Sequence, residues 1–256
     1  MRELERLDRH HNGSPLSGDP PARVIGVIGA GRLGTGLRDA LAAAGHTVDG
    51  PHGRGATGEA ADVVLLAVPD GQIAAAAALI APGRLVGHCS GATTLEPLHP
   101  HEAFSLHPLM TVTPGHARFA GAAAAVAGTT DRARCTASDL ATSLGMTPVE
   151  VADEHRAAYH AAASVASNFL VTLQAAAERL AATAGVDREH LVPLVRASVE
   201  NWAAMGPERA LTGPVARGDH ETVARQRAQI AERAPDLPPL FDELVAATKR
   251  VGAVPA

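Results

Sequence analysis

Short apolar runs alternate with helical patterns over the first part of the chain. Most of these runs end in Gly or Asp, and a short apolar run with such an end predicts a buried strand. The runs lie at residues 23–31, 46–50, 61–70, 84–91, 104–110, 122–128 and 147–151, with helical patterns between them at 32–45, 71–83 and 131–145. In the first helix, Leu33, Leu37 and Leu41 recur every four residues and share one face. Because strands and helices alternate, we predict an α/β fold with a doubly wound parallel sheet.

The pattern changes after residue 153, where no further strand is predicted. Long helical patterns follow at 154–184, 188–204, 220–233 and 239–250, separated by segments that contain Gly and Pro. Residues 1–22 are charged and then rich in Gly, Ser and Pro, without periodicity, as disordered segments are. We therefore predict a disordered leader over 1–22, a sheet domain over 23–153 and a smaller all-helical domain over 154–256.

One helix carries polar side chains within an otherwise small and apolar sequence. In AYHAAASVASNFL, residues 158–170, helical spacing puts His160, Ser164, Ser167 and Asn168 on one face. Buried polar groups need hydrogen-bond partners. The stripe therefore either meets polar groups of the protein or faces a ligand.

Composition and charge narrow the classes of partner. The chain has 256 residues, 46% of them hydrophobic but only 2% aromatic, so Ala, Val, Leu and Ile must build its core. A net charge of −5 and few stacking aromatics argue against nucleic-acid binding. No apolar run suits a membrane span, no secretory signal begins the chain, and Cys89 and Cys135 give no disulfide framework. These features predict a cytoplasmic protein whose partner is a small molecule rather than a membrane.

The turn after the first predicted strand reads GAGRLG and contains Gly29, Gly31 and Gly34. In a dinucleotide-binding unit the first glycine permits the tight turn, the second lets a pyrophosphate approach, and the third packs helix on strand. An ordinary tight turn is the alternative, but the motif lies at the strand-to-helix junction that a cofactor turn requires. We therefore predict a Rossmann-type domain that contacts its cofactor here, including at Arg32 and Leu33.

The end of the second predicted strand decides between NAD and NADP. An acidic residue there binds the ribose hydroxyls of NAD, whereas an arginine accepts the 2′-phosphate of NADP. The segment VDGPHGRG offers Asp49, which we place inside the strand, and Arg54, 20 residues beyond Gly34. NADP is therefore favoured over NAD, and a solvated loop position is the alternative reading of Arg54.

Two further strand ends carry candidate contacts. Val68 and Pro69 end one strand and are expected beside the cofactor, since ligands bind outside the carboxyl ends of parallel strands. A plain turn is the alternative there. HCSGA ends the next strand, where Ser90 and the amide of Gly91 are placed to hold a substrate carboxylate. The neighbouring Cys89 is interpreted as a small buried thiol, because no activating group accompanies it.

Four histidines follow within a short stretch. His99, His101, His107 and His116 lack the spacing and the carboxylate or thiolate partners of a metal site, so no metal is predicted. His107 differs from the other three because FSLHPLM is typical of a strand. The end of that strand places His107 near the crevice where the cofactor is expected. A functional and a structural role for His107 are both open.

The segment LTGPVARGDH separates two predicted helices and holds Thr212, Arg217 and Asp219. Asp219 is expected to cap the helix that follows it. Arg217 is suited to a substrate carboxylate or a cofactor phosphate, and a surface ion pair is the alternative.

In this order, GAGRLG, HCSGA, SLHPL, YHAAASVASNFL and LTGPVARGD resemble the bacterial Rossmann-like oxidoreductases that carry domain of unknown function 2520 at the C-terminus. The resemblance spans nearly everything after Ala22. The group is similar to the 6-phosphogluconate, 3-hydroxyacid and ketopantoate dehydrogenases, in which a sheet domain binds NADP and a helical domain supplies the acid/base residue. The resemblance implies a homodimer through the helical domain and makes ketopantoate the leading substrate.

The same resemblance suggests roles for the polar helix. Ketopantoate and 3-hydroxyacid dehydrogenases present a Lys and then Asn residues, four apart, on the first long helix of their second domain. The corresponding positions here are His160, Ser164 and Asn168, so an imidazole replaces the ammonium donor. The HPL segment is also similar to the His-Pro pair of prephenate dehydrogenases, although the C-terminal motifs fit that family poorly.

These features combine into one mechanistic hypothesis. NADPH reduces a small 2-oxo acid, with ketopantoate to pantoate in pantothenate biosynthesis as the first choice, and a histidine protonates the alkoxide. His160 is the first candidate acid and His107 the second. The candidates for holding the substrate are Ser164, Asn168, Ser90, Gly91 and Arg217.

Three alternatives stay open at this point. The polar stripe is also suited to hydrogen bonds between helices in an Ala-rich dimer core. A protein that binds NADP without turnover, as a sensor or regulatory module, has the same cofactor motif, because fold does not fix function. An enzyme that reduces imines, or one that oxidises an acid of the prephenate type, is the third.

Overall fold

A computed structural model describes residues 23–113 and 117–252, so the predicted leader over 1–22 and His116 lie outside the described residues. The chain divides into two compact units, one up to Ala162 and one from Ala163 onwards. The sequence analysis placed this division after residue 153, just beyond the last predicted strand.

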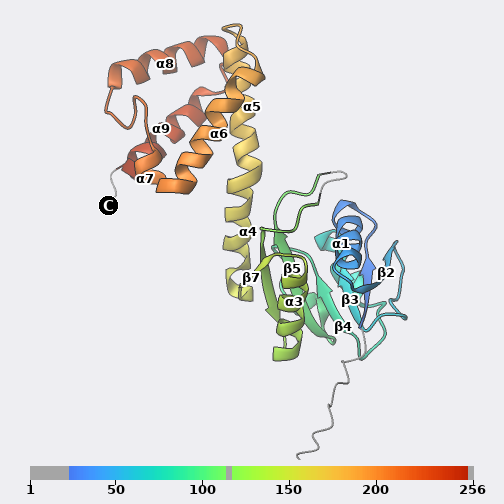
Figure 1. Ribbon diagram of the computed structural model, residues 1–256. Coiled ribbons are helices and arrows are strands. Elements are labelled where there is room, and N and C mark those ends of the chain that lie inside the picture. Colours follow the sequence, from blue (N-terminus) through green and yellow to red (C-terminus); the bar gives the residue numbers. More distant parts are fainter. Residues whose placement is uncertain (1–22, 114–116, 253–256) are drawn as a thin grey trace, which may run out of the picture. The chain divides into compact units, whose positions relative to one another are not determined.

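The first unit is built on a seven-stranded sheet (Figure 1). Its strands are β1 (Val24–Ile28), β2 (Thr47–His52), β3 (Val63–Leu66), β4 (Leu85–His88), β5 (Glu102–Leu109), β6 (Ala123–Gly128) and β7 (Thr147–Glu150). Their order across the sheet is β2-β1-β3-β4-β5-β6-β7. Each strand overlaps a run that the hydrophobic pattern predicts, and the α/β fold class is confirmed.

One pair of strands departs from the predicted parallel sheet. β5 and β6 are antiparallel, with Phe104 opposite Gly128, whereas the other neighbouring strands are parallel. Parallel neighbours need a crossover connection, usually a helix. The described residues between β5 and β6 contain no helix, so the chain turns back beside β5.

Helices cover both faces of this sheet. They are α1 (Arg32–Ala43), α2 (Ile73–Ala77) and α3 (Asp131–Ser143), with 3-10 turns η1 (Asp70–Gln72), η2 (Glu96–Leu98) and η3 (Asp153–His155). Val63 and Leu65 of β3 belong to the core cluster of Leu37 on α1. The alternate residues Val64 and Leu66 belong to the core cluster of α2. Strands that are buried on both faces explain the unbroken apolar runs in the sequence.

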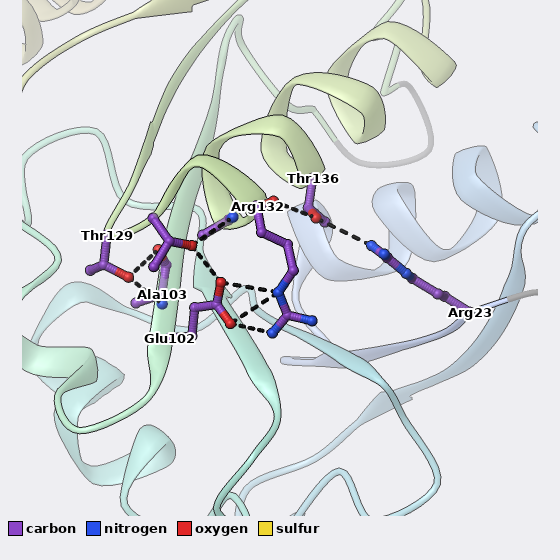
Figure 2. A network of polar contacts seen from close by, with 8 residues as sticks. Arg23, Glu102, Ala103, Thr129, Arg132 and Thr136 are labelled. Atoms are coloured by element: carbon purple, nitrogen blue, oxygen red, sulfur yellow. Dashed lines mark hydrogen bonds and ion pairs between the residues drawn. The ribbon is translucent and has the colours of Figure 1, made fainter. Parts of the chain in front are cut away.

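Polar contacts fix the start of α3 against β5 (Figure 2). Arg132 and Thr130 both donate hydrogen bonds to the carboxylate of Glu102, and Arg132 Nε lies 3.1 Å from each oxygen. The hydrogen bonds from Arg132 and Thr130 lower the pKa of Glu102 to about 2. The Thr130 hydroxyl also accepts from the N–H of Ala133 and so caps α3. The start of α3 is thereby held to the strand that carries His107.

The second unit contains only helices in its described residues. α4 (Arg156–Ser164) begins in the first unit and leads into a π-helical turn (Val165–Phe169), which is followed by α5 (Leu170–Ala182), α6 (Arg188–Met205), α7 (Pro207–Ala210), α8 (His220–Arg233) and α9 (Pro238–Gly252). The continuous helix predicted over 154–184 is therefore interrupted. In the π turn the Ser167 hydroxyl donates to the carbonyl oxygen of Ala163 at 2.7 Å, a local bond of the kind that bends helices. Among the helices described, none combines the length and the apolar composition of a membrane span.

The turn between β1 and α1 brings two strands and a helix into close contact. Gly29 has a φ of +120°, which residues with a side chain rarely adopt, and a Cβ there would lie 2.2 Å from the carbonyl oxygen of Ala67. A Cβ on Gly34 would lie 1.8 Å from the carbonyl oxygen of Gly29. At Gly31, by contrast, no described atom comes within 4 Å of an added Cβ. Packing therefore requires the first and third glycines and leaves space at the second.

We predict that Gly34→Ala destabilises the first unit, whereas Gly31→Ala leaves it folded. The first methyl group collides with a backbone carbonyl, and overpacking of this kind costs about 1–3 kcal/mol or more. The Gly31→Ala substitution adds a methyl group in open space, at a residue whose φ of −77° suits alanine. Urea denaturation of the two variants and the wild type measures the difference. Equal midpoints for both variants would contradict the packing role of Gly34.

Candidate functional site

Strand register places several predicted segments at one edge of the sheet. The parallel pairs align Ile28 of β1 with Leu66 of β3, Leu66 with His88 of β4, and His88 with Ser105 of β5. The segments just beyond these positions are Gly29–Gly34, Val68–Pro69, Ser90–Gly91 and His107. We call this side of the sheet the carboxyl edge. Ligands of doubly wound sheets bind at such an edge.

The N-terminus of α1 opens at the carboxyl edge without a side-chain cap. Gly31 is its N-cap residue, and no side chain among the described residues accepts from its first N–H groups. Free N–H groups and the helix dipole together favour an anion at this position. Arg32 is exposed at the first helical position, and Leu33 is half-buried against the core. The turn therefore has the space and the donors that a pyrophosphate requires.

A cavity of about 350 Å³ begins next to this turn, where Ile28 contributes to its wall. Val68 and Leu79 are among its apolar lining residues, and Arg54 is its charged one. Arg54 lies in the turn after β2 and is exposed, so its guanidinium is accessible to a ligand. Pro69 is exposed directly before η1. The cavity thus combines apolar walls with one cation.

Two histidine rings pack against Gly91 at the same edge. A Cβ on Gly91 would lie 2.8 Å from Cδ2 of His160 and 2.9 Å from both Cε1 and Nε2 of His107. The ring centroids are 6.2 Å apart, with 71° between the ring planes. His160 is exposed on α4, whereas His107 is half-buried on β5. Both candidate acids therefore lie at the end of β4, within the first unit.

Tyr159 is a member of this site that the sequence analysis missed. Its hydroxyl oxygen lies 2.7 Å from Nδ1 of His107, and the two rings form an edge-to-face pair with centroids 5.6 Å apart. Burial, with nearby His160 and Arg156, lowers the pKa of His107 to about 4, so this ring is neutral at pH 7. Burial raises the pKa of Tyr159, against the opposing effect of Arg156. One signal was present in the sequence, because Tyr159 is the single tyrosine of the chain.

A buried arginine connects the elements of the site. Arg156 is 1% exposed, and it donates to the Asp153 carboxylate through Nε and to the Ser90 carbonyl oxygen through Nη1, each at 3.1 Å. It also donates to the hydroxyl of Ser105 on β5 through Nη2. Burial lowers its pKa, and the contact with Asp153 opposes that change. The start of α4 is thereby bound to β5 and to the segment that contains Gly91. Sequence reasoning gave no reason to bury an arginine at a helix start.

The loop after β4 is held by its own polar groups. The Ser90 hydroxyl accepts from the N–H of Thr93 and donates to the Thr93 hydroxyl, both at 2.9 Å. Nδ1 of His88 accepts from the N–H of Ser90, so Nε2 carries the proton and donates to the carbonyl oxygen of Thr94. Burial lowers the pKa of His88, which is therefore a neutral structural residue. The Ser90 hydroxyl is engaged within the loop, and its contact with a substrate carboxylate stays a prediction.

Three other residues that the sequence analysis considered, a cysteine and two histidines, also lie in the first unit. Burial raises the pKa of Cys89 to about 12, which agrees with its interpretation as a packed thiol. His101 Nε2 lies 3.0 Å from the carbonyl oxygen of Ala77, and His99 is exposed. Within the described residues, no group of three or more His, Cys, Asp or Glu side chains is arranged for a metal ion.

Three predicted site residues belong to the second unit. Ser164 ends α4, Asn168 is exposed in the π turn, and Arg217 is exposed in the segment before α8. Their roles stay predictions. Asp219 accepts from the N–H of Thr222 at 3.0 Å and caps α8, as expected.

Solved structures share this fold. A Bacteroides fragilis protein proposed to be an NADP oxidoreductase is 18% identical, with a TM-score of 0.76 over 89% of this chain and 98% of that one. A Thermotoga maritima protein is 23% identical, with a TM-score of 0.72 over the same shares, 89% and 98%. An imine reductase from Streptomyces aurantiacus is 16% identical, with a TM-score of 0.62 over 90% of this chain and 95% of that one. No curated protein matches the chain.

A family match covers the C-terminal half. Residues 122–248 match the family described as domain of unknown function (DUF2520). The match begins near β6 of the sheet and ends within α9, so it includes parts of both compact units. This chain therefore has a Rossmann-like fold, and its residues 122–248 match the DUF2520 family.

Proposed function

We propose that this protein is an NADPH-dependent reductase of a small carbonyl compound. One observation carries the proposal: two features lie at the same carboxyl edge of the sheet. They are the open, uncapped turn at Gly31 and the two histidine rings that pack against Gly91. The first feature suits a cofactor phosphate and the second suits proton transfer. The likeness in fold to an NADP oxidoreductase and an imine reductase supports the reaction class.

NADPH fits the residues of the first unit in three places. The space at Gly31 and the free N–H groups of α1 suit the pyrophosphate. The apolar cavity wall that includes Val68 and Leu79 suits the adenosine, and Arg54 is placed to pair with the 2′-phosphate. When bound, the reduced nicotinamide supplies a hydride. The protein must then hold the carbonyl compound and protonate its oxygen.

A histidine at Gly91 supplies that proton. A carbonyl carbon that accepts a hydride leaves its electron pair on oxygen, and the resulting alkoxide must be protonated. General acid catalysis of this kind contributes about 10²–10⁴ in rate. His107 and His160 both lie against Gly91, at the carboxyl edge of the sheet.

A 2-oxo acid is the substrate class that we favour, with ketopantoate as the first choice. The groups around His107 include Arg156, His160 and His88, all of which disfavour its protonation. Such an environment suits the carboxylate of an oxo acid. Ser164, Asn168 and Arg217 of the second unit remain our candidates for substrate contacts. Reduction of ketopantoate would place the protein in pantothenate biosynthesis.

An imine is the second candidate substrate. The likeness to the Streptomyces aurantiacus imine reductase favours it, and an imine carbon accepts a hydride as a carbonyl carbon does. The proton would then go to nitrogen, so the same residues of the protein serve both reactions.

We also propose that the second unit pairs with a second copy of the chain. Large apolar side chains are exposed on it, including Val171 at 69%, Leu194 at 66% and Trp202 at 59%. Its fully buried core, in the described residues, is the small cluster around Ile230 and Leu237. Exposed apolar surface of this extent is typical of an interface. A homodimer would cover it.

We predict that the protein binds NADPH more tightly than NADH and that Arg54→Ala removes the preference. Loss of a charge-assisted contact to the 2′-phosphate should weaken NADPH binding about 10–100-fold and leave NADH binding unchanged. Calorimetric titration with both cofactors measures this, with Arg196→Ala, an exposed arginine on α6, as the matched control. Equal affinity of the wild type for both cofactors would contradict the role of Arg54.

We predict oxidation of NADPH in the presence of a small 2-oxo acid, fastest with ketopantoate. A panel of oxo acids and cyclic imines, followed by NADPH absorbance, tests this, with prephenate and NADP⁺ as the reverse-direction arm. Gly31→Ala should abolish turnover while the protein stays folded, since its methyl group fills the space for the pyrophosphate. Tight NADPH binding without oxidation by any compound would instead support a sensor.

We predict a dimer in solution that Val171→Asp together with Leu194→Glu converts to a monomer. Charges at these exposed apolar positions oppose burial between two copies. Light scattering after size exclusion measures the mass. Val149→Glu, at a similarly exposed position on β7 (48%), is the control and should leave the dimer intact. A monomeric wild type at micromolar concentration would overturn the proposal.

A further inference from the structure

The two candidate acids at Gly91 differ in what surrounds them. His160 is exposed, and the described contacts of its ring are packing contacts with Gly91 and His107. His107 is half-buried, and Nδ1 lies 2.7 Å from the hydroxyl oxygen of Tyr159. Nε2 of the same ring lies beside Gly91, on the side where a substrate is expected. One ring therefore connects a phenol to the candidate substrate position.

The direction of this contact depends on the tautomer of His107, and hydrogen-bond chemistry favours one of the two. A phenol is a better donor than a neutral imidazole N–H, and an imidazole nitrogen is a better acceptor than a phenol oxygen. Tyr159 therefore donates to Nδ1, and the single proton of the neutral His107 ring resides on Nε2. That N–H is the one beside Gly91.

A neutral imidazole that acted alone would leave the negative charge on its own ring. Loss of the Nε2 proton would create an imidazolate that is half-buried, whereas a phenol, with an ordinary pKa of about 10, carries the same charge as a much weaker base. The alternative state, a protonated His107, is disfavoured because burial lowers its pKa to about 4. The charged and titratable groups around it are His160 and Arg156 of α4, His88 of β4 and Asp70 of η1, and only Asp70 favours protonation. The ring needs a proton at Nδ1 at the moment when Nε2 gives one up.

We propose that Tyr159 and His107 form a proton relay, in which Tyr159 protonates Nδ1 while Nε2 protonates the reduced substrate. This inference deepens the proposed reductase function and rests on it. The O–H bond of Tyr159 and the Nε2–H bond of His107 break, and an Nδ1–H bond and a substrate O–H or N–H bond form. The imidazole stays neutral and changes tautomer. The negative charge moves from the alkoxide to the phenolate.

The positive charge of Arg156 stabilises the phenolate form of Tyr159. It lies one helical turn before Tyr159 on α4, and its charge lowers the pKa of the phenol, although burial raises that pKa overall. The phenol is therefore protonated at rest and is stabilised by a nearby cation when it ionises. After product release, Nε2 takes up one proton from bulk solvent, and the Nδ1 proton returns to the phenolate of Tyr159, so each turnover consumes one proton from solution. Arg156 is a positioning residue in this scheme, because it binds Ser90, Asp153 and Ser105 rather than the substrate.

Variants of the pair test the relay in the intact protein. With the best substrate of the panel, Tyr159→Phe and His107→Asn should each lower kcat by about 100-fold, since each removes the same proton path. The double variant should be no slower than His107→Asn, because groups that act as one unit are non-additive. His155→Gln, an exposed neighbour on η3, is the control and should keep wild-type kcat. Wild-type kcat in Tyr159→Phe, or effects that multiply, would overturn the relay.

The pH profile separates the relay from a histidinium donor. A relay through neutral His107 keeps its rate as pH falls and loses it only when the ring protonates, near pH 4. A histidinium donor has the opposite dependence, because it loses rate as pH rises and the donor ring loses its second proton. Loss of activity in His160→Gln, combined with full activity in Tyr159→Phe, would assign the acid to His160 and reject the relay.

A measurement without turnover keeps the relay distinguishable from the reductase function. Nitrogen NMR of ¹⁵N-histidine protein reports the tautomer of His107, which should be the Nε2–H form in the wild type and should lose that bias in Tyr159→Phe. An Nδ1–H tautomer, or no change in Tyr159→Phe, would reject the relay whatever the enzyme assay shows. NADPH that is never oxidised would instead reject the reductase function itself.

Discussion

The guanidinium of Arg156 is almost wholly removed from water and has three protein partners on three different segments. It donates to the carboxylate of Asp153, the carbonyl oxygen of Ser90 and the hydroxyl of Ser105. A buried charge is strongly unfavourable unless its donors are satisfied, so these bonds allow one arrangement of the start of α4 against β4 and β5. The candidate site inherits that arrangement, because His107 lies on β5 and its tyrosine partner lies on α4, one turn after the arginine.

The parts of the site that the sequence predicts are those with a local cause. Apolar runs buried on both faces produce the strands, and parallel register then brings the ends of β1, β3, β4 and β5 to one edge. The glycine turn is local as well: Gly29 needs a positive φ and Gly34 needs the absence of a side chain. Arg54 was chosen from its distance along the chain and lines the cavity beside this turn, and its contact with the cofactor stays a prediction. His107 and His160 were each expected as candidate acids. That both rings pack against Gly91 was not predicted.

The parts that the sequence did not predict depend on contacts between distant segments. The antiparallel return at β6 is decided by a connection that has no helix among its described residues, which strand patterning does not encode. Arg156 has the pattern of an exposed helix-start residue, and only the partners from β4 and β5 explain its burial. Tyr159 was passed over because helical spacing directed attention to the face of His160. The π turn, where Ser167 bonds to Ala163, is equally invisible to a periodicity of 3.6.

The groups around the neutral ring of His107 also affect the moment at which it takes up a second proton. At rest, burial and the nearby His160 and Arg156 keep a second proton off His107. When an oxygen next to Nε2 acquires negative charge, that charge counteracts the effect of these groups on the pKa of His107. It raises the affinity of the ring for a proton at Nδ1. Tyr159 is the donor already in contact with that nitrogen. Nδ1 therefore accepts the proton of Tyr159 as negative charge develops on the substrate. The same surroundings that keep His107 neutral at rest make it suitable for passing a proton from Tyr159 to the substrate.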